Sequence, residues 1–197
     1  MTKTGDTPLS DFVKDYIKNK YKKPGEVFLG TIHRLDRPTS GVVLFARTSK
    51  ALRRMNEQFK KKEVKKTYWA VVNSIPPKIS GILDNFLRKN ETRNKSYITR
   101  NSQGKHAILE YRMLKKLDHF YHLEIKPRTG RHHQIRVQLA NIGCIIKGDL
   151  KYGAKRPNKD SSINLLSQKL EFTHPVTKKS ITIIAPPPKD NIWNACV

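Results

Sequence analysis

Apolar residues recur at helical spacing in two segments near the start of the chain. Thr7 followed by Pro8 is the pattern of an N-cap and a first helical turn, and it predicts a helix over residues 8–21. The apolar positions of that helix are Leu9, Phe12, Val13, Tyr16 and Ile17. A second helix is expected to begin at Ser49. Its apolar stripe is Leu52, Met55 and Phe59, with lysines and arginines on the other face.

Runs of β-branched and aromatic residues predict strands. These strands are expected at residues 27–32, 42–46, 67–72, 97–100, 107–117 and 121–126, with turns at 101–104 and 118–119. Another helix of about three turns is expected after Gly130, ending at Gly143. Residues 170–172 and 181–184 resemble the arms of a hairpin. The predicted class is α+β: one domain over residues 1–197, with a mixed, mainly antiparallel sheet and a few flanking helices.

The charge of the chain indicates an anionic partner. Its 197 residues include 40 Lys and Arg against 16 Asp and Glu, which gives a formal net charge of +24 at pH 7. Because these cations are spread through a sequence with enough hydrophobic residues to fold, they are typical of a surface that neutralises nucleic-acid phosphates. A solvated basic surface and an anionic membrane are the alternatives.

Several classes of protein are disfavoured by what the sequence lacks. No apolar run approaches the ~18 residues of a membrane span, and no secretory signal pattern opens the chain. We therefore expect a cytoplasmic protein without a membrane partner. Cys144 and Cys196 have no CxxC spacing, which argues against a zinc ribbon or a disulfide scaffold.

Three polar segments are candidates for chemistry. Residues 33–41 read HRLDRPTSG between two predicted strands, where functional loops are often held; a turn with solvated arginines is the alternative. Residues 129–136 read TGRHHQIR, with a glycine and an arginine at a helix start that suit an anion; a plain helix cap with exposed basic residues is the alternative. The adjacent histidines lack the spacing of a metal pair. Residues 148–153 read GDLKYG, which is typical of a turn.

Taken together, these segments resemble the signatures of the RluA-type RNA pseudouridine synthases. The first is similar to HRLDxxTSG, the second and third to TGRxHQIR and GDxxYG, and residues 66–68 to KxY, in the family's order from Val27 onward. Gln138 and residues 165–167 depart from the family's RVH and LHA patterns. The opening strand and NKPxG-like segment of that family are not found before the first helix, so the chain is expected to be N-terminally trimmed and to lack the S4-like domain that precedes the catalytic part in many relatives.

The resemblance implies isomerisation of uridine to pseudouridine in ribosomal or transfer RNA, within a basic cleft. Asp36 takes the position of the essential carboxylate, acting as nucleophile, as base or as stabiliser of charge on the sugar. Arg131 is expected to pair with Asp36, and Tyr68 to lie against the flipped uracil. The remaining residues expected to bind substrate are His33, Arg34, Arg37, Thr39, Ile135, Lys61 and Lys62.

Several of these assignments have a structural alternative. Tyr68 and Ile135 fit core packing, and the lysine runs fit a solvated face. The resemblance implies no cofactor, no metal and no obligatory protein partner, and we expect a monomer. A catalytically silent RNA-binding or ribosome-assembly module is the competing interpretation of the whole chain.

Overall fold

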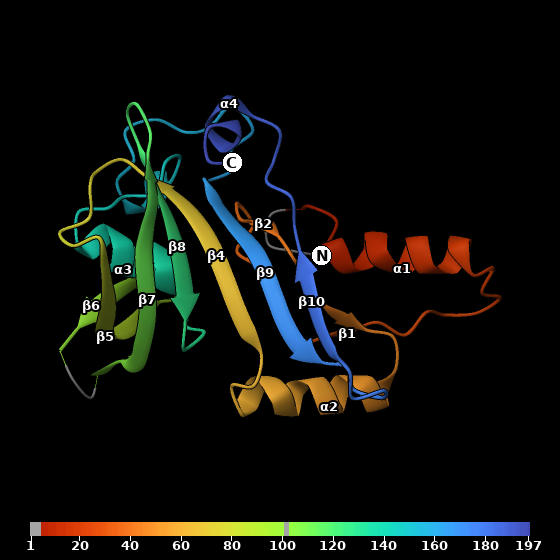
Figure 1. Ribbon diagram of the computed structural model, residues 1–197. Helices are drawn as coiled ribbons and strands as arrows, with labels where there is room; N and C mark the ends of the chain where they lie inside the picture. Colours follow the sequence, from red (N-terminus) through yellow and green to blue (C-terminus); the bar gives the residue numbers. More distant parts are fainter. Residues whose placement is uncertain (1–4, 101–102) are drawn as a thin grey trace.

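A curved sheet forms the centre of the structure, a computed structural model that describes residues 5–100 and 103–197. Its strands lie in the order β10-β9-β4-β8-β7-β5-β6, each antiparallel to its neighbours (Figure 1). Their bounds are β4 Lys65–Val72, β5 Ser80–Asn90, β6 Lys95–Thr99, β7 Lys105–Lys116, β8 Tyr121–Pro127, β9 Leu165–Thr173 and β10 Ser180–Ile184. The short β2 (Ser40–Gly41) joins β9 in parallel. The predicted α+β class with a mixed, mainly antiparallel sheet is confirmed.

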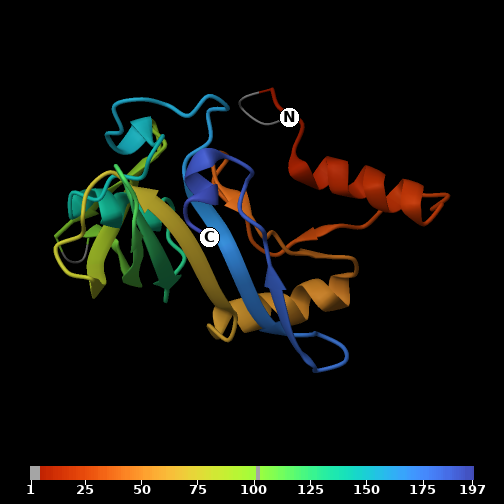
Figure 2. The ribbon, with the colours of Figure 1, turned by 45° about the horizontal axis from the view of Figure 1, so that its top comes forward.

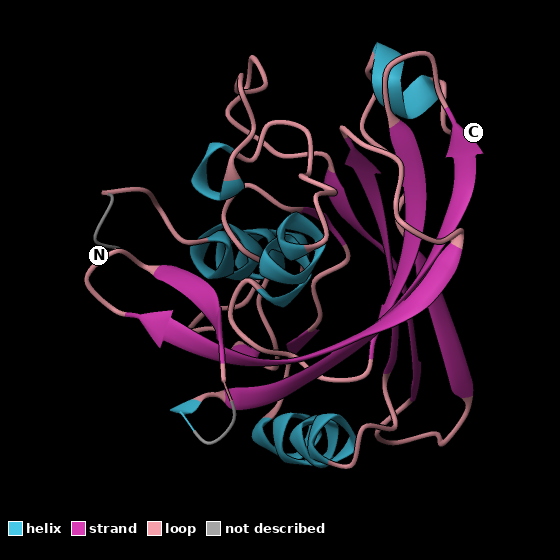
Figure 3. Ribbon diagram, turned by 90° about the vertical axis from the view of Figure 1, so that its left-hand side faces the viewer, coloured by secondary structure: helices cyan, strands magenta, loops and turns pink. Residues whose placement is uncertain are grey.

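Helices cover the sheet where their apolar faces meet it. The helix α3 (Gln134–Asn141) packs against one face of the sheet, whose strands curve in Figure 3. There Ile135 and Leu139 pack with residues of β4, β7 and β8. The helix α2 (Ser49–Lys60) buries Met55 against Leu170 and Phe172 of β9. The shorter elements are the 3₁₀ turn η2 (Leu150–Tyr152) and α4 (Asn191–Asn194), whose Trp193 packs on Val71 and Leu166.

The first 46 residues depart most from the predictions. The helix α1 is Leu9–Lys20, with Pro8 rather than Thr7 as its N-cap residue and no side-chain cap. It lies to the side of the sheet, beyond β10 (Figures 1 and 2). Of its predicted apolar stripe only Ile17 is buried, whereas Leu9, Phe12 and Tyr16 are 54%, 60% and 57% exposed. The apolar spacing therefore predicts the helix correctly, but it does not predict that most of its apolar side chains are exposed.

The two predicted early strands are also shorter than expected. The run 27–32 contributes only β1 (Gly30–Thr31), and 42–46 only β3 (Phe45–Ala46), which pair with each other. Phe28 is half exposed, so this apolar run does not lie in a buried sheet. The later strands and the hairpin fall where they were predicted, with differences at their ends. Part of the predicted turn at 101–104 lies outside the described residues.

Two other elements differ from the sequence interpretation. The eleven residues of β5 were not predicted, because Gly81, Asp84 and Asn85 interrupt any apolar alternation there. The helix α3 has eight residues, so it is shorter than three turns. It starts late because His133, its N-cap residue, has a left-handed backbone with φ 53°. No helix in the described part of the chain is long and apolar enough to cross a membrane.

Candidate active site

A cavity of about 360 Å³ collects most of the residues singled out from the sequence. The loop between β1 and β2, the end of α2, β4 and the loop before α3 line it. Predicted site residues in its wall are His33, Arg34, Asp36, Thr39, Tyr68, Arg131 and Ile135. Asp36 keeps 28% of its side chain exposed there. Segments about 100 residues apart in sequence thus meet around one carboxylate.

The loop that carries Asp36 is fixed by backbone contacts from Asp36 to Gly41. The amide of Thr39 donates to the carbonyl of Asp36 at 2.8 Å, which closes a turn, and Ile163 donates to Pro38 at 2.9 Å. Gly41 then pairs with Ser167 at φ 117°. A Cβ there would lie 2.3 Å from the Ser167 carbonyl oxygen, so only glycine lets the loop join β9.

His33 supports this loop from inside. Its Nε2 accepts a hydrogen bond from the amide of Leu44 at 3.0 Å, and its ring stacks on Phe59. Burial, reinforced by the charge of Lys66, lowers the pKa of His33 to about 4. The ring is therefore neutral at pH 7, and its contacts position the loop.

The partner of Asp36 is Arg136 on α3. Its Nη1 lies 3.3 Å from Asp36 Oδ2, while its Nε and Nη2 donate to the two carboxylate oxygens of Asp149, both at 2.7 Å. Arg136 is 5% exposed and Asp149 1%. Burial alone would lower the pKa of Arg136, but the hydrogen bonds and charge of Asp149, with Asp36, raise it. Arg136 therefore stays charged beside the carboxylate.

His133 approaches Asp36 from the start of α3. Its Nε2 lies 3.6 Å from Asp36 Oδ2, its Nδ1 is 3.0 Å from the Tyr152 hydroxyl, and its ring stacks on His132. Burial and the charge of Arg136 lower the pKa of His133 to about 3. It is thus neutral at pH 7, and the approach to Asp36 is not an ion pair.

Tyr68 and Ile135 form the apolar part of the cavity. Tyr68 lies on β4 opposite Ile125, and burial raises the pKa of its hydroxyl, which keeps its proton at neutral pH. Ile135 is 7% exposed and also belongs to the main core cluster. Ile135 therefore lines the cavity and packs in the core at the same time.

The expected pairing of Asp36 with Arg131 is corrected by this geometry. Arg131 lines the cavity, but it is exposed and its Nε donates to the carbonyl of His106 at 2.8 Å. Arg136, which makes the contact instead, stands in the same segment and within a helix. A buried arginine requires a buried acid. Asp149 in the third polar segment was therefore the feature of the sequence that could have pointed to Arg136.

The remaining predicted residues differ in position. Thr39 lines the cavity with a buried hydroxyl that has no hydrogen-bond partner in the described residues, and Arg34 lines it from an exposed position. Arg37 does not line it, since its guanidinium forms an ion pair with Asp6 at 2.9 Å. Lys62 lines a neighbouring groove, whereas Lys61 lines neither space.

Metal-ligating side chains do not gather in the described structure. Among residues 5–100 and 103–197, no three His, Cys, Asp or Glu side chains are grouped so that they could hold an ion. Both cysteines are free and buried.

Comparisons with known proteins agree on one family. The family model for RNA pseudouridylate synthase matches residues 3–141. Ribosomal large subunit pseudouridine synthase C of Buchnera aphidicola is 37% identical over 172 residues, 83% of this chain and 55% of that protein. An uncharacterized RNA pseudouridine synthase of Zymomonas mobilis is 39% identical over 160 residues, 80% of this chain and 73% of that protein. The chain thus spans about half the length of the first relative and about three quarters of the second.

Solved structures share the fold. Human RNA pseudouridylate synthase domain containing 4 superposes with a TM-score of 0.78 at 22% identity, over 96% of this chain and 82% of that one. Human RNA pseudouridylate synthase domain containing 1 gives a TM-score of 0.72 at 24% identity, over 93% and 77%. At these identities the likeness concerns the fold.

Proposed function

Because the chain belongs to the RNA pseudouridylate synthase family, we propose that it converts uridine to pseudouridine in RNA, with Asp36 as the reacting carboxylate. The observation that carries this proposal is the place of Asp36: a partly exposed carboxylate in a cavity, with one contact to a buried arginine. The reaction breaks the N1–C1′ bond, turns the uracil and forms a C5–C1′ bond; C5 then loses its hydrogen as a proton to solvent, and N1 takes up a proton. It needs one carboxylate beside C1′ and exclusion of water.

The side chains around Asp36 have distinct tasks in this proposal. Arg136 holds Asp36 in position through its Nη1 contact at 3.3 Å. Tyr68 offers an aromatic face to the flipped uracil, and its protonated hydroxyl serves proton transfer. His33 and His133 are neutral at pH 7 and act by positioning. Ile135 closes the cavity wall.

The substrate is proposed to be ribosomal or transfer RNA, bound by a monomer in the cytoplasm through one catalytic domain over residues 1–197. The net charge of +24 supports a phosphate-rich partner. Mapping of pseudouridine in both RNA classes, with and without the gene, identifies the modified uridine. Retention of every pseudouridine in the deleted strain would contradict this assignment.

The catalytic assignment is tested by Asp36→Asn, which keeps the size of the side chain and removes its charge. In a tritium-release assay on RNA labelled at uracil C5, turnover should fall to background while RNA affinity changes little. Asp118→Asn, at an exposed turn residue, is the matched control. Substantial release by Asp36→Asn would refute the role of Asp36. RNA binding without release by the unmodified chain would favour the silent module.

A further inference from the structure

Lys66 is a partly buried cation between two hollows of the surface. It lines the cavity of Asp36 and also a neighbouring groove of about 1010 Å³ between the end of α2 and the strands β4, β7, β8 and β9. A Cβ at Gly130 would lie 3.5 Å from the Lys66 ammonium nitrogen, so this ammonium lies against the backbone before Arg131. Both hollows are lined by Lys66, Gly130 and Arg131. These residues mark the passage between them.

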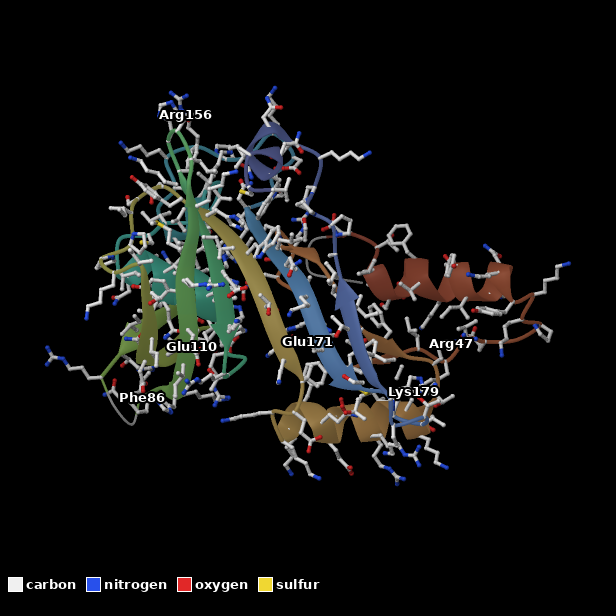
Figure 4. All side chains as sticks on the ribbon, in the orientation of Figure 1. Arg47, Phe86, Glu110, Arg156, Glu171 and Lys179 are labelled. Carbon is white, nitrogen blue, oxygen red and sulfur yellow. The ribbon has the colours of Figure 1, made fainter. Side chains whose placement is uncertain are left out.

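The Lys66 ammonium has no acidic partner within the described part of the chain. Both carboxylates of the groove are engaged elsewhere: Glu110 with Arg128, and Glu171 with Lys169 at 3.1 Å. Figure 4 labels these two acids, on β7 and β9, which flank the pair β4 and β8. Asp36, the carboxylate of the cavity, contacts Arg136.

An unpaired charge at this depth is costly. Burial lowers the pKa of Lys66, which shows that its surroundings disfavour the ammonium form. A partly buried cation without a counter-ion is a poor choice for stability alone, since an apolar side chain would fill the same space at lower cost. The position of Lys66 therefore suits a cation whose counter-ion is an anion bound from outside the chain.

Arg131 supplies a second donor at the same place. Its Nε is used by the carbonyl of His106, and no ion pair of Arg131 occurs among residues 5–100 and 103–197. The contact with His106 holds the side chain through Nε, and within the described residues Nη1 and Nη2 of this exposed guanidinium make no hydrogen bond. Lys66 on β4 and Arg131 before α3 thus present two cations from different segments.

We propose that Lys66, with Arg131, binds the RNA phosphate directly adjacent to the uridine held at Asp36. This rests on the proposed function, which places the ribose of the target nucleotide at Asp36. The strand must then leave the cavity, and the passage into the basic groove carries it past these two cations. A phosphodiester is the anion that accompanies the nucleotide along this path. Arg131 is thereby assigned to backbone binding.

The test replaces Lys66 by methionine and measures binding to a short hairpin RNA with a single loop uridine. Removal of one phosphate contact should weaken binding about tenfold and flatten the slope of log K against log salt by about 0.7. Lys66→Arg should restore most of the affinity. Lys179→Met, at the exposed β9–β10 turn in Figure 4, is the control and should leave the slope unchanged.

A second measurement locates the phosphate. Hairpins in which either the 5′ or the 3′ phosphate of the uridine is a neutral methylphosphonate are bound to the native chain and to Lys66→Met. One of the two hairpins should bind the native chain about tenfold more weakly, with no further loss for Lys66→Met. The proposal would be overturned if methylphosphonate substitution weakened RNA binding by the same factor in the native chain and in Lys66→Met. It would also be overturned if the slope of log K against log salt were the same for both proteins.

Stability distinguishes this function from a structural role. Because Lys66→Met removes an uncompensated charge, its melting temperature should equal or exceed that of the native chain. A variant that binds less RNA because it is unfolded would contradict this, and Lys66→Gln then repeats the binding test. These binding readouts need no turnover, so absence of tritium release by the native chain would refute the proposed function while leaving the phosphate site testable.

Discussion

Asp149→Asn should be among the most damaging changes near the cavity, although Asp149 does not line it. The substitution keeps the size of the side chain and removes the charge that Arg136 contacts through two hydrogen bonds of 2.7 Å. Arg136 is 5% exposed and Asp149 1%, so water cannot replace the lost partner. Removing one member of a buried ion pair costs about 3–5 kcal/mol.

That cost is large relative to the stability of a folded domain, which is about 5–15 kcal/mol. We therefore expect urea unfolding, followed by the fluorescence of Trp69 and Trp193, to show a loss of about 3–5 kcal/mol for Asp149→Asn. Single-turnover tritium release, measured where the variant is still folded, should be about 100-fold slower, because Arg136 no longer holds Asp36 within about 1 Å of its position.

A double variant separates the two effects. Arg136→Met with Asp149→Leu replaces the ion pair by apolar side chains of similar size, a change that is often neutral for stability. It should recover most of the lost unfolding free energy and remain inactive, since Asp36 has lost its arginine. Loss of less than about 1 kcal/mol in Asp149→Asn, or a double variant as unstable as the single one, would contradict the cost assigned to breaking this buried ion pair.

Two further changes address buried polar groups. Tyr152→Phe should cost about 1–3 kcal/mol in urea unfolding, because the Tyr152 hydroxyl bonds the amide and carbonyl of Ser96 and meets His133; an unchanged midpoint would contradict this network. His122→Leu should raise the unfolding free energy at pH 7 by about 1 kcal/mol, since neither ring nitrogen has a partner in the described structure. Burial and the charge of Lys115 lower the folded pKa of His122 to about 4 from 6.5, against the charge of Glu124. Because the unfolded chain then binds a proton at His122 that the folded chain does not, the unfolding free energy of the native chain should fall by up to about 3 kcal/mol between pH 6.5 and pH 4. His122→Leu should show a smaller decline over this range. Parallel pH profiles of the two proteins would assign the acid sensitivity to other residues.

The sequence predicts elements well where burial and periodicity coincide. The helix α2 buries Met55 of its apolar stripe, and β7 buries alternate residues from Ala107 to Tyr111, whereas β4 is recognised by its β-branched and aromatic run, which ends in the fully buried residues 70–72. The run 27–32 fails because its apolar residues meet α2 and β3 through a short bridge instead of entering the sheet. The strand β5 was missed because polar residues interrupt its pattern while its backbone pairs along eight residues of β7.

The site divides in a similar way. Local motifs bring Asp36, Tyr68 and Arg131 to one cavity, as the resemblance implied. The identity of the ion-pair partner did not follow from them, because Arg131 precedes α3 and donates to His106, whereas Arg136 lies within α3 and bonds Asp149. The left-handed backbone of His133 stands between the two arginines, and neither spacing nor composition reports it.

The unequal contacts of Arg136 explain how one arginine can hold a reactive carboxylate without neutralising it. Asp149 takes the two short hydrogen bonds at 2.7 Å and is buried, whereas Asp36 takes a single contact at 3.3 Å and stays 28% exposed. Since the strong bonds compensate the burial of the guanidinium, Asp36 does not have to, and its oxygens remain available to the sugar. Without Asp149, the guanidinium has only Asp36 to bind. The guanidinium is then no longer fixed in the place from which it contacts Asp36, so the buried acid that does not line the cavity keeps in position the one that does.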